Sequence, residues 1–163
     1  KSCFIRGWNF LSELERLHRF ITRVFALLMS RLDAVAGRET VRTVFRLVGE
    51  SVGERVEARL KERYSVNSWT LERLVELLAK DVIAPVIGAS NVSFEGGDEE
   101  MRLMFTVCPF EKLGFDIASK FYCTYTHGVI EEAALKALGN VKVEAEKLRS
   151  EGADKCIFRI RKT

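Results

Sequence analysis

Three thiols and one imidazole in the last third of this chain are the side chains best suited to metal binding or catalysis. Cys123 and His127 lie four residues apart in a predicted helix, which places them on one face, one turn apart. Cys108 follows a predicted strand and Cys156 opens another, and thiolate and imidazole are both good zinc ligands. However, no two cysteines form a CxxC pair, and free cysteine often packs as a small hydrophobe. We therefore expect no cofactor. The alternatives are a zinc ion held by these four side chains and a disulfide between two of the thiols.

Aromatic residues gather in the same region, around the junction between a predicted strand and the helix that follows it. The cluster comprises Phe105, Phe110, Phe115, Phe121 and Tyr125. A domain of this size can enclose an apolar pocket with few polar groups, although packing in an ordinary core accounts for the same residues. We expect these side chains to line a pocket that binds a small hydrophobic or aromatic molecule.

Several function classes are disfavoured by the motifs that the sequence lacks. It contains no nucleophile elbow, phosphate-binding glycine loop, HExxH motif or dinucleotide fingerprint. The net charge is only +3, and the arginines of the first fifty residues are matched by acidic residues, so no nucleic acid is expected as a partner. No apolar run is long enough to cross a bilayer, so no membrane contact is expected. Four cysteines without a dense disulfide framework favour the reducing cytoplasm.

Length and composition indicate an ordinary globular protein. With 163 residues, 47% of them hydrophobic and 30% charged, the chain suits one domain with an added N-terminal element. It contains no glutamine and is rich in Glu, Lys, Arg and Val. This composition resembles that of thermophile proteins, in which labile amides are scarce and ion pairs are common.

The first helix is expected to end near Gly37 and to carry an unusually broad apolar face. Spacings of three and four residues mark a heptad seam formed by Leu11, Leu14, His18, Ile21, Phe25, Leu28, Leu32 and Val35. A neighbouring stripe comprises Leu17, Phe20, Val24 and Leu27. A face of this width must be covered on more than one side. We therefore predict that residues 1–37 form a homodimer contact and that residues 38–163 form one compact ligand-binding unit.

The remaining chain reads as two more helices and then two hairpins. Gly49 and Gly53 lie one turn apart in the second helix, which is tolerated where another backbone or a ligand approaches closely, and we expect close packing of a backbone. A third helix is expected to end at Pro85 and Gly88. The further elements expected are strands near 92–94 and 101–107, a helical segment 115–138 with Gly128 as a candidate break, and strands 141–148 and 156–160. The predicted fold class is α+β, with three N-terminal helices packed on an antiparallel sheet of two hairpins separated by a helical segment.

Four short motifs carry a resemblance to a known family. They are Gly49-x3-Gly53, Val107-Cys108-Pro109-Phe110, Phe121-Tyr122-Cys123 and the ending Glu151-Gly-Ala-Asp-Lys-Cys-Ile-Phe158. Over roughly Val41 to Ile160 the chain resembles the 4-vinyl reductase domain and is similar to the 2-amino-thiazoline-4-carboxylic acid hydrolase family. The resemblance implies helices packed on an antiparallel sheet around a hydrophobic ligand cavity, as in the ligand-sensing part of aromatic-responsive bacterial regulators.

The same resemblance bears on metal binding and catalysis. In the sensor members, cysteines and a glutamate hold a zinc, and Cys123 and Cys156 match two of those positions, whereas Leu148 and Ala145 occupy the other two. Half of that site is therefore missing. The resemblance favours a small-molecule-binding domain without complete catalytic machinery. The alternative is a hydrolase of a cyclic C–N bond that uses Cys108 or Cys123 as a thiolate or metal ligand, with His127 as the activating neighbour.

Overall fold

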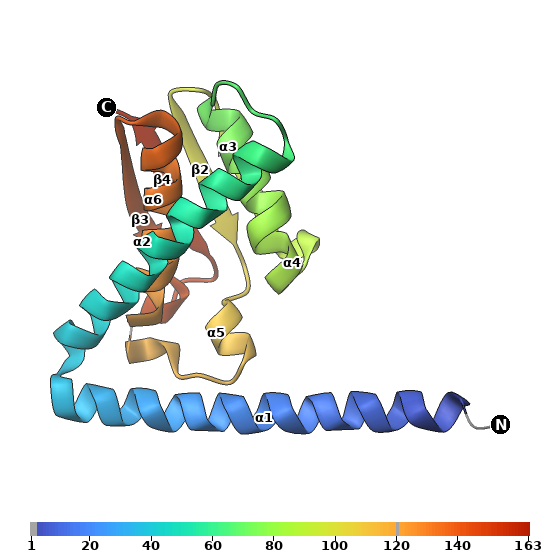
Figure 1. Ribbon diagram of the computed structural model, residues 1–163. Coiled ribbons are helices and arrows are strands. Elements are labelled where there is room, and N and C mark those ends of the chain that lie inside the picture. Colours follow the sequence, from blue (N-terminus) through green and yellow to red (C-terminus); the bar gives the residue numbers. More distant parts are fainter. Residues whose placement is uncertain (1–2, 120) are drawn as a thin grey trace. The chain divides into compact units, whose positions relative to one another are not determined.

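The computed structural model describes residues 3–119 and 121–163 of the chain (Figure 1). The chain divides after Gly37 into two compact units. The first unit is the single long helix α1 (Cys3–Ala36). It ends at Gly37, whose φ of +79° lies in the left-handed region that glycine adopts readily, as the sequence predicts. No helix among the described residues combines the length and the apolar character needed to cross a bilayer.

The second unit is built around a close pair of helices, α2 (Arg38–Arg63) and α6 (Phe121–Leu138). A Cβ atom built on Gly49 would lie 2.3 Å from the carbonyl oxygen of Tyr125, and one on Gly128 would lie 2.6 Å from that of Arg46. The close backbone approach predicted from Gly49 and Gly53 is therefore confirmed. Gly128 does not break α6, because it serves the same contact from the other helix.

The third helical region is less regular than its sequence pattern indicates. Helix α3 (Leu71–Leu77) starts at Thr70, whose side chain accepts a hydrogen bond from the Arg73 amide. It continues directly into a π-helix, η1 (Leu78–Ile83), and then into α4 (Ala84–Ile87). Pro85 lies in the first turn of α4, where a missing N–H is tolerated, so it does not end the helix as predicted. The helical run ends at Gly88.

The four strands form one antiparallel sheet in the order β1-β2-β4-β3. The strands are β1 (Val92–Gly96), β2 (Glu100–Phe105), β3 (Val141–Lys147) and β4 (Cys156–Lys162). The two predicted hairpins are present, and pairing of β2 with β4 joins them into one sheet. The α+β fold class is therefore confirmed, with helices packed on a sheet of two hairpins separated by a helical segment.

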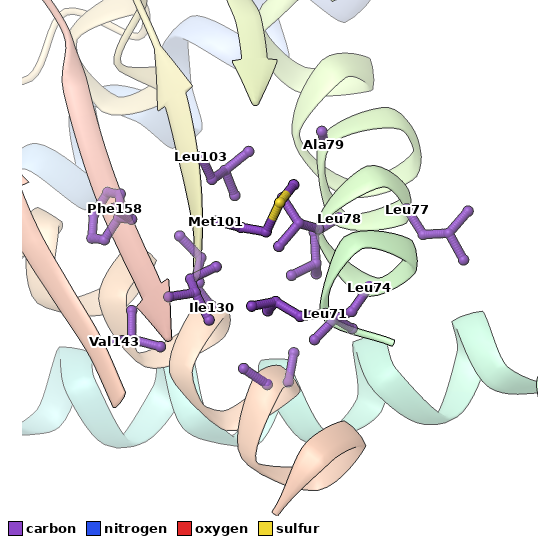
Figure 2. Close-up of a cluster of buried hydrophobic side chains, with 14 of the residues drawn as sticks. Leu71, Leu74, Leu77, Leu78, Ala79, Met101, Leu103, Ile130, Val143 and Phe158 are labelled. Carbon is purple, nitrogen blue, oxygen red and sulfur yellow. The ribbon is translucent and has the colours of Figure 1, made fainter. Parts of the chain in front are cut away.

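One face of the sheet forms the core together with the helices. Figure 2 shows Met101 and Leu103 of β2 facing Leu71 and Leu78, and Phe158 of β4 belongs to the same buried cluster. The opposite face carries charged side chains at alternate positions, as the two-residue period of a strand requires. There Glu144 of β3 pairs with Lys142 and Arg159, and Arg102 pairs with Glu146.

Short segments around the ends of the strands complete the unit and position the residues of the candidate site. Cys108 directly precedes α5 (Pro109–Lys112), and a 3-10 turn η3 (Ile117–Ser119) lies before α6. A second 3-10 turn, η4 (Arg149–Glu151), connects β3 to β4. These turns bring the region after β2 and the start of β4 to the N-terminal end of α6, through ring contacts of Phe110 and the Cys123–Ser150 contact.

Candidate functional site

The second unit contains a cavity of about 230 Å³. Its wall comes from α2, the η1–α4 segment, β2, α5 and α6. Of the thirteen described residues that line it, eleven are apolar, two carry hydroxyl groups and none is charged. Val86 of α4 lines the cavity and is also 56% exposed. Such a concave, mostly apolar space with few polar groups is typical of small-molecule sites.

The π-helix and α4 supply much of the wall, which the sequence analysis did not predict. Leu78, Val82 and Ile83 come from η1, and Val86 and Ile87 from α4. π-helical turns are uncommon and often occur at functional sites. The apolar residues around Pro85 are the only local signal of this wall, and they are equally typical of the end of a buried helix.

Three of the five aromatic residues predicted to form a pocket line this cavity, namely Phe105, Phe110 and Tyr125. The other two are not among its lining residues. Phe115 stacks on Tyr122 with ring centroids 5.5 Å apart, and Phe121 packs against Phe45 of α2 at 5.3 Å. Helix α6 begins at Phe121, on the side that faces α2.

The aromatic side chains form a connected group that holds α5 against α6. The ring of Phe110 stacks on Tyr122 at 4.7 Å and meets Tyr125 edge-on at 5.8 Å. Each such pair contributes about 0.5–1.5 kcal/mol beyond the burial of its area. Phe110 is therefore held in place at the boundary between the cavity and the helix that carries Tyr125.

The structure brings the three predicted thiols together. Cys108, Cys123 and Cys156 border a second, narrow space of about 10 Å³, roughly the room that one water molecule needs. This space shares Phe105, Phe110 and two further wall residues with the larger cavity. The thiols come from three separate segments, so their proximity depends on packing and not on sequence spacing. None of these three cysteines forms a disulfide.

Cys108, Cys123 and Cys156 lie in environments that differ from one another. Cys156 is 5% exposed, and its sulfur accepts a hydrogen bond from the Arg149 amide at 3.4 Å. Burial raises the pKa of the Cys156 thiol to about 11, so it is protonated at neutral pH. The sulfur of Cys123 lies 3.1 Å from the hydroxyl oxygen of Ser150 in η4. Cys108 is 8% exposed.

His127 does not join the thiols in a ligand set. Its Nε2–H donates to the carbonyl oxygen of Val143 at 3.0 Å, and its ring lies 5.8 Å from that of Phe158. Burial lowers the pKa of the imidazole, which favours the neutral form. Within residues 3–119 and 121–163, no group of three His, Cys, Asp or Glu side chains is arranged to hold a metal ion. The residues present do not fit the zinc site that the resemblance implies, because Leu148 also lines the thiol space.

Comparison with known proteins shows which solved structures have a similar fold. No curated protein matches this chain. Among solved structures, a trafficking protein particle complex subunit 3 from Naegleria fowleri, covalently bound to palmitic acid, has a TM-score of 0.65 and 19% sequence identity, with 91% of this chain and 96% of that chain covered. At this identity the likeness shows a shared fold.

A second solved structure is more distant. It is the H-NOX protein from Shewanella woodyi bound to IWP-051, with a TM-score of 0.45, 14% identity and coverage of 85% of this chain and 68% of that chain. The resemblance to the 4-vinyl reductase domain is compatible with this small fold but is not itself confirmed. The model of a different family, described as methanogen output domain 1, matches residues 28–161, and the protein therefore belongs to that family.

Proposed function

We propose that this domain binds a small hydrophobic or aromatic molecule in the cavity between α2, the η1–α4 segment and α6. The observation that carries the proposal is the cavity itself, about 230 Å³ in volume with an almost wholly apolar wall. An apolar cavity of about 150 Å³ stays dry and holds benzene. A cavity of this volume therefore suits a substituted ring or a short hydrocarbon chain.

The shared fold supports the proposal. The subunit from Naegleria fowleri carries palmitic acid on a fold similar to this one. Palmitic acid has far more carbon atoms than benzene, so the present cavity suits a more compact ligand. The description of the family as an output domain fits a module that responds to a signal.

Binding without catalysis is favoured over the alternative, a hydrolase of a cyclic C–N bond. A catalytic thiol needs a lowered pKa or an activating base. His127, the activating neighbour in that alternative, instead donates to the Val143 carbonyl, and the sulfur of Cys123 lies against the Ser150 hydroxyl. These three thiols, none of which forms a disulfide, also suit the reducing cytoplasm expected from the sequence. We propose that the domain needs no metal cofactor.

A thermal shift experiment tests the binding proposal. A ligand that binds only the native state at a hundred times its Kd adds about 2.7 kcal/mol of stability, which raises the Tm by roughly 5–10 °C for a chain of this size. Toluene, indole and other compact aromatic or hydrocarbon molecules form the panel. If none of them raises the Tm of the wild-type protein, the proposal fails.

A matched pair of variants assigns the binding to the cavity. Val82 lines the cavity, and Val82→Phe should fill it and abolish the shift. Val44, which is 51% exposed on α2 and outside the lining, provides the control Val44→Phe, which should keep the shift. An equal shift in both variants would place the ligand elsewhere.

We also propose that the protein is a homodimer in which α1 packs against α1 of a second copy. Nine large apolar residues of α1 between positions 14 and 35 are exposed, from 41% at Leu32 to 87% at Val35, whereas Met29 is buried. Leu14, Ile21 and Leu28 recur every seven residues together with Val35, which is the self-complementary spacing of a coiled coil. A seam with this spacing packs best against the identical seam of a second copy.

The oligomeric state of the intact chain tests this proposal. Light scattering should give a dimer for the wild-type protein and a monomer for Leu28→Glu, which places a charge in the seam. Ser30→Glu adds the same charge at an exposed position of α1 outside the seam and should stay dimeric. A monomeric wild-type protein would refute the proposal.

A further inference from the structure

The two polar side chains of the cavity wall have unused hydrogen-bonding groups. Tyr125 and Thr126 are consecutive residues of α6, and both line the cavity. Within the described part of the chain, neither hydroxyl has a hydrogen-bond partner. The neighbouring Thr124, by contrast, donates to the carbonyls of Phe121 and Arg42. Neither hydroxyl is engaged by another described residue, so both are available to a ligand that enters the cavity.

The protonation state of Tyr125 makes it a donor. Burial alone raises the pKa of its phenol, so the hydroxyl keeps its proton at neutral pH. A threonine hydroxyl also donates. A ligand with a hydrogen-bond acceptor would satisfy these groups, whereas a pure hydrocarbon would cover them and leave them without a partner, which is unfavourable.

The charge of the wall limits the ligand further. None of the described lining residues is charged, and an ionised group transferred into an apolar space without a counter-charge is strongly disfavoured. A carboxylate or an ammonium group is therefore a poor occupant. A neutral acceptor, such as the carbonyl oxygen of a ketone, aldehyde, ester or amide, meets both conditions.

We infer that the ligand is a compact, neutral molecule with a carbonyl-type acceptor oxygen, recognised by the hydroxyl groups of Tyr125 and Thr126. The inference rests on the proposed function and specifies the chemical class that the cavity selects. Its apolar body would contact the side chains of η1 and α4, and its oxygen would face α6. Thr126 also borders the thiol space, so the oxygen would lie on the side of the cavity next to the cysteines.

Two probes of nearly equal shape test the inference. Acetophenone carries a carbonyl oxygen where α-methylstyrene carries a methylene group, so only acetophenone can accept a hydrogen bond. The dissociation constants of both are measured by calorimetry for the wild-type protein, Tyr125→Phe and Thr126→Val. Tyr122→Phe is the matched control, because Tyr122 precedes these residues in α6 and does not line the cavity.

Each cavity variant should weaken acetophenone binding by roughly two- to tenfold, the value of one neutral hydrogen bond, and should not weaken α-methylstyrene binding, because the hydroxyl that this hydrocarbon would leave without a partner is gone. Tyr122→Phe should change neither. Because the Tyr125 hydroxyl has no partner in the protein, Tyr125→Phe should also keep the wild-type Tm, which verifies that the variant folds. If the variants bind both probes as the wild type does, or lose both equally, the inference is overturned while the proposed function stands. If neither probe binds the wild-type protein while members of the thermal shift panel do, the inference alone is overturned; if the panel fails as well, the proposed function and the inference both fail.

Discussion

The contact between α2 and α6 makes a sharp prediction about Gly49. This residue meets the main chain of Tyr125, and a Cβ atom there would lie 2.3 Å from the Tyr125 carbonyl oxygen. The obstacle is backbone in the middle of a helix, so it cannot rotate away as a side-chain end would. Gly49→Ala therefore forces α2 and α6 to separate by roughly 1 Å before ordinary van der Waals contact is restored.

The magnitude follows from two opposing effects. Alanine gains about 1 kcal/mol over glycine inside a helix. Overpacking of a tight contact costs about 1–3 kcal/mol, and a backbone obstacle places this case at the upper end. We expect Gly49→Ala to lower the free energy of unfolding by about 2 kcal/mol, which corresponds to a fall in Tm of roughly 4–8 °C for a chain of this size. Tyr125 lines the cavity, so ligand affinity should fall as well.

Urea and thermal unfolding of the variant provide the measurement. Gly97 supplies the control, since a Cβ there meets nothing within 4 Å and its φ is not positive. Gly97→Ala should change the free energy of unfolding by less than about 0.5 kcal/mol. If Gly49→Ala were as stable as the wild type, the close helix contact would not exist as described and the reasoning would be refuted.

Three further predictions concern titration, reactivity and metal content. Lys142 and Arg159 lower the pKa of Glu144 from 4.5 to about 2, so its carboxylate stabilises the fold above pH 4.5 and this contribution is lost as the pH falls through 2. Glu144→Gln should therefore flatten the fall of Tm across that range, whereas Glu62→Gln, at an exposed position, should keep the wild-type slope. Cys156, with a pKa of about 11, should resist alkylation near neutral pH until the protein unfolds, and its rapid modification in the folded state would contradict its burial. Protein purified without a metal-affinity tag should contain less than about a tenth of an equivalent of zinc per chain, and a full equivalent would overturn the proposal that no metal is needed.

The sequence by itself determined the elements whose signals are local. Periods of three to four and of two residues predicted α2, α6 and the two hairpins, because each pattern reflects which face of one element is buried. Gly37 was predicted as the end of the first helix, and it has a positive φ. The glycine pair at 49 and 53 predicted a close backbone approach before the partner helix was known. The fold class followed from the order of these elements.

Only the tertiary structure decided how the elements meet. The pairing of β2 with β4 joins segments more than fifty residues apart, such as Phe105 and Cys156, and no local pattern specifies it. The same long-range packing brings the thiol segments together and directs Phe121 toward α2 instead of the cavity. The sequence also did not predict the π-helix at 78–83, since an apolar run fits an α-helix equally well. A cavity is the space that packing leaves between elements, so its wall became known only when their mutual positions were known.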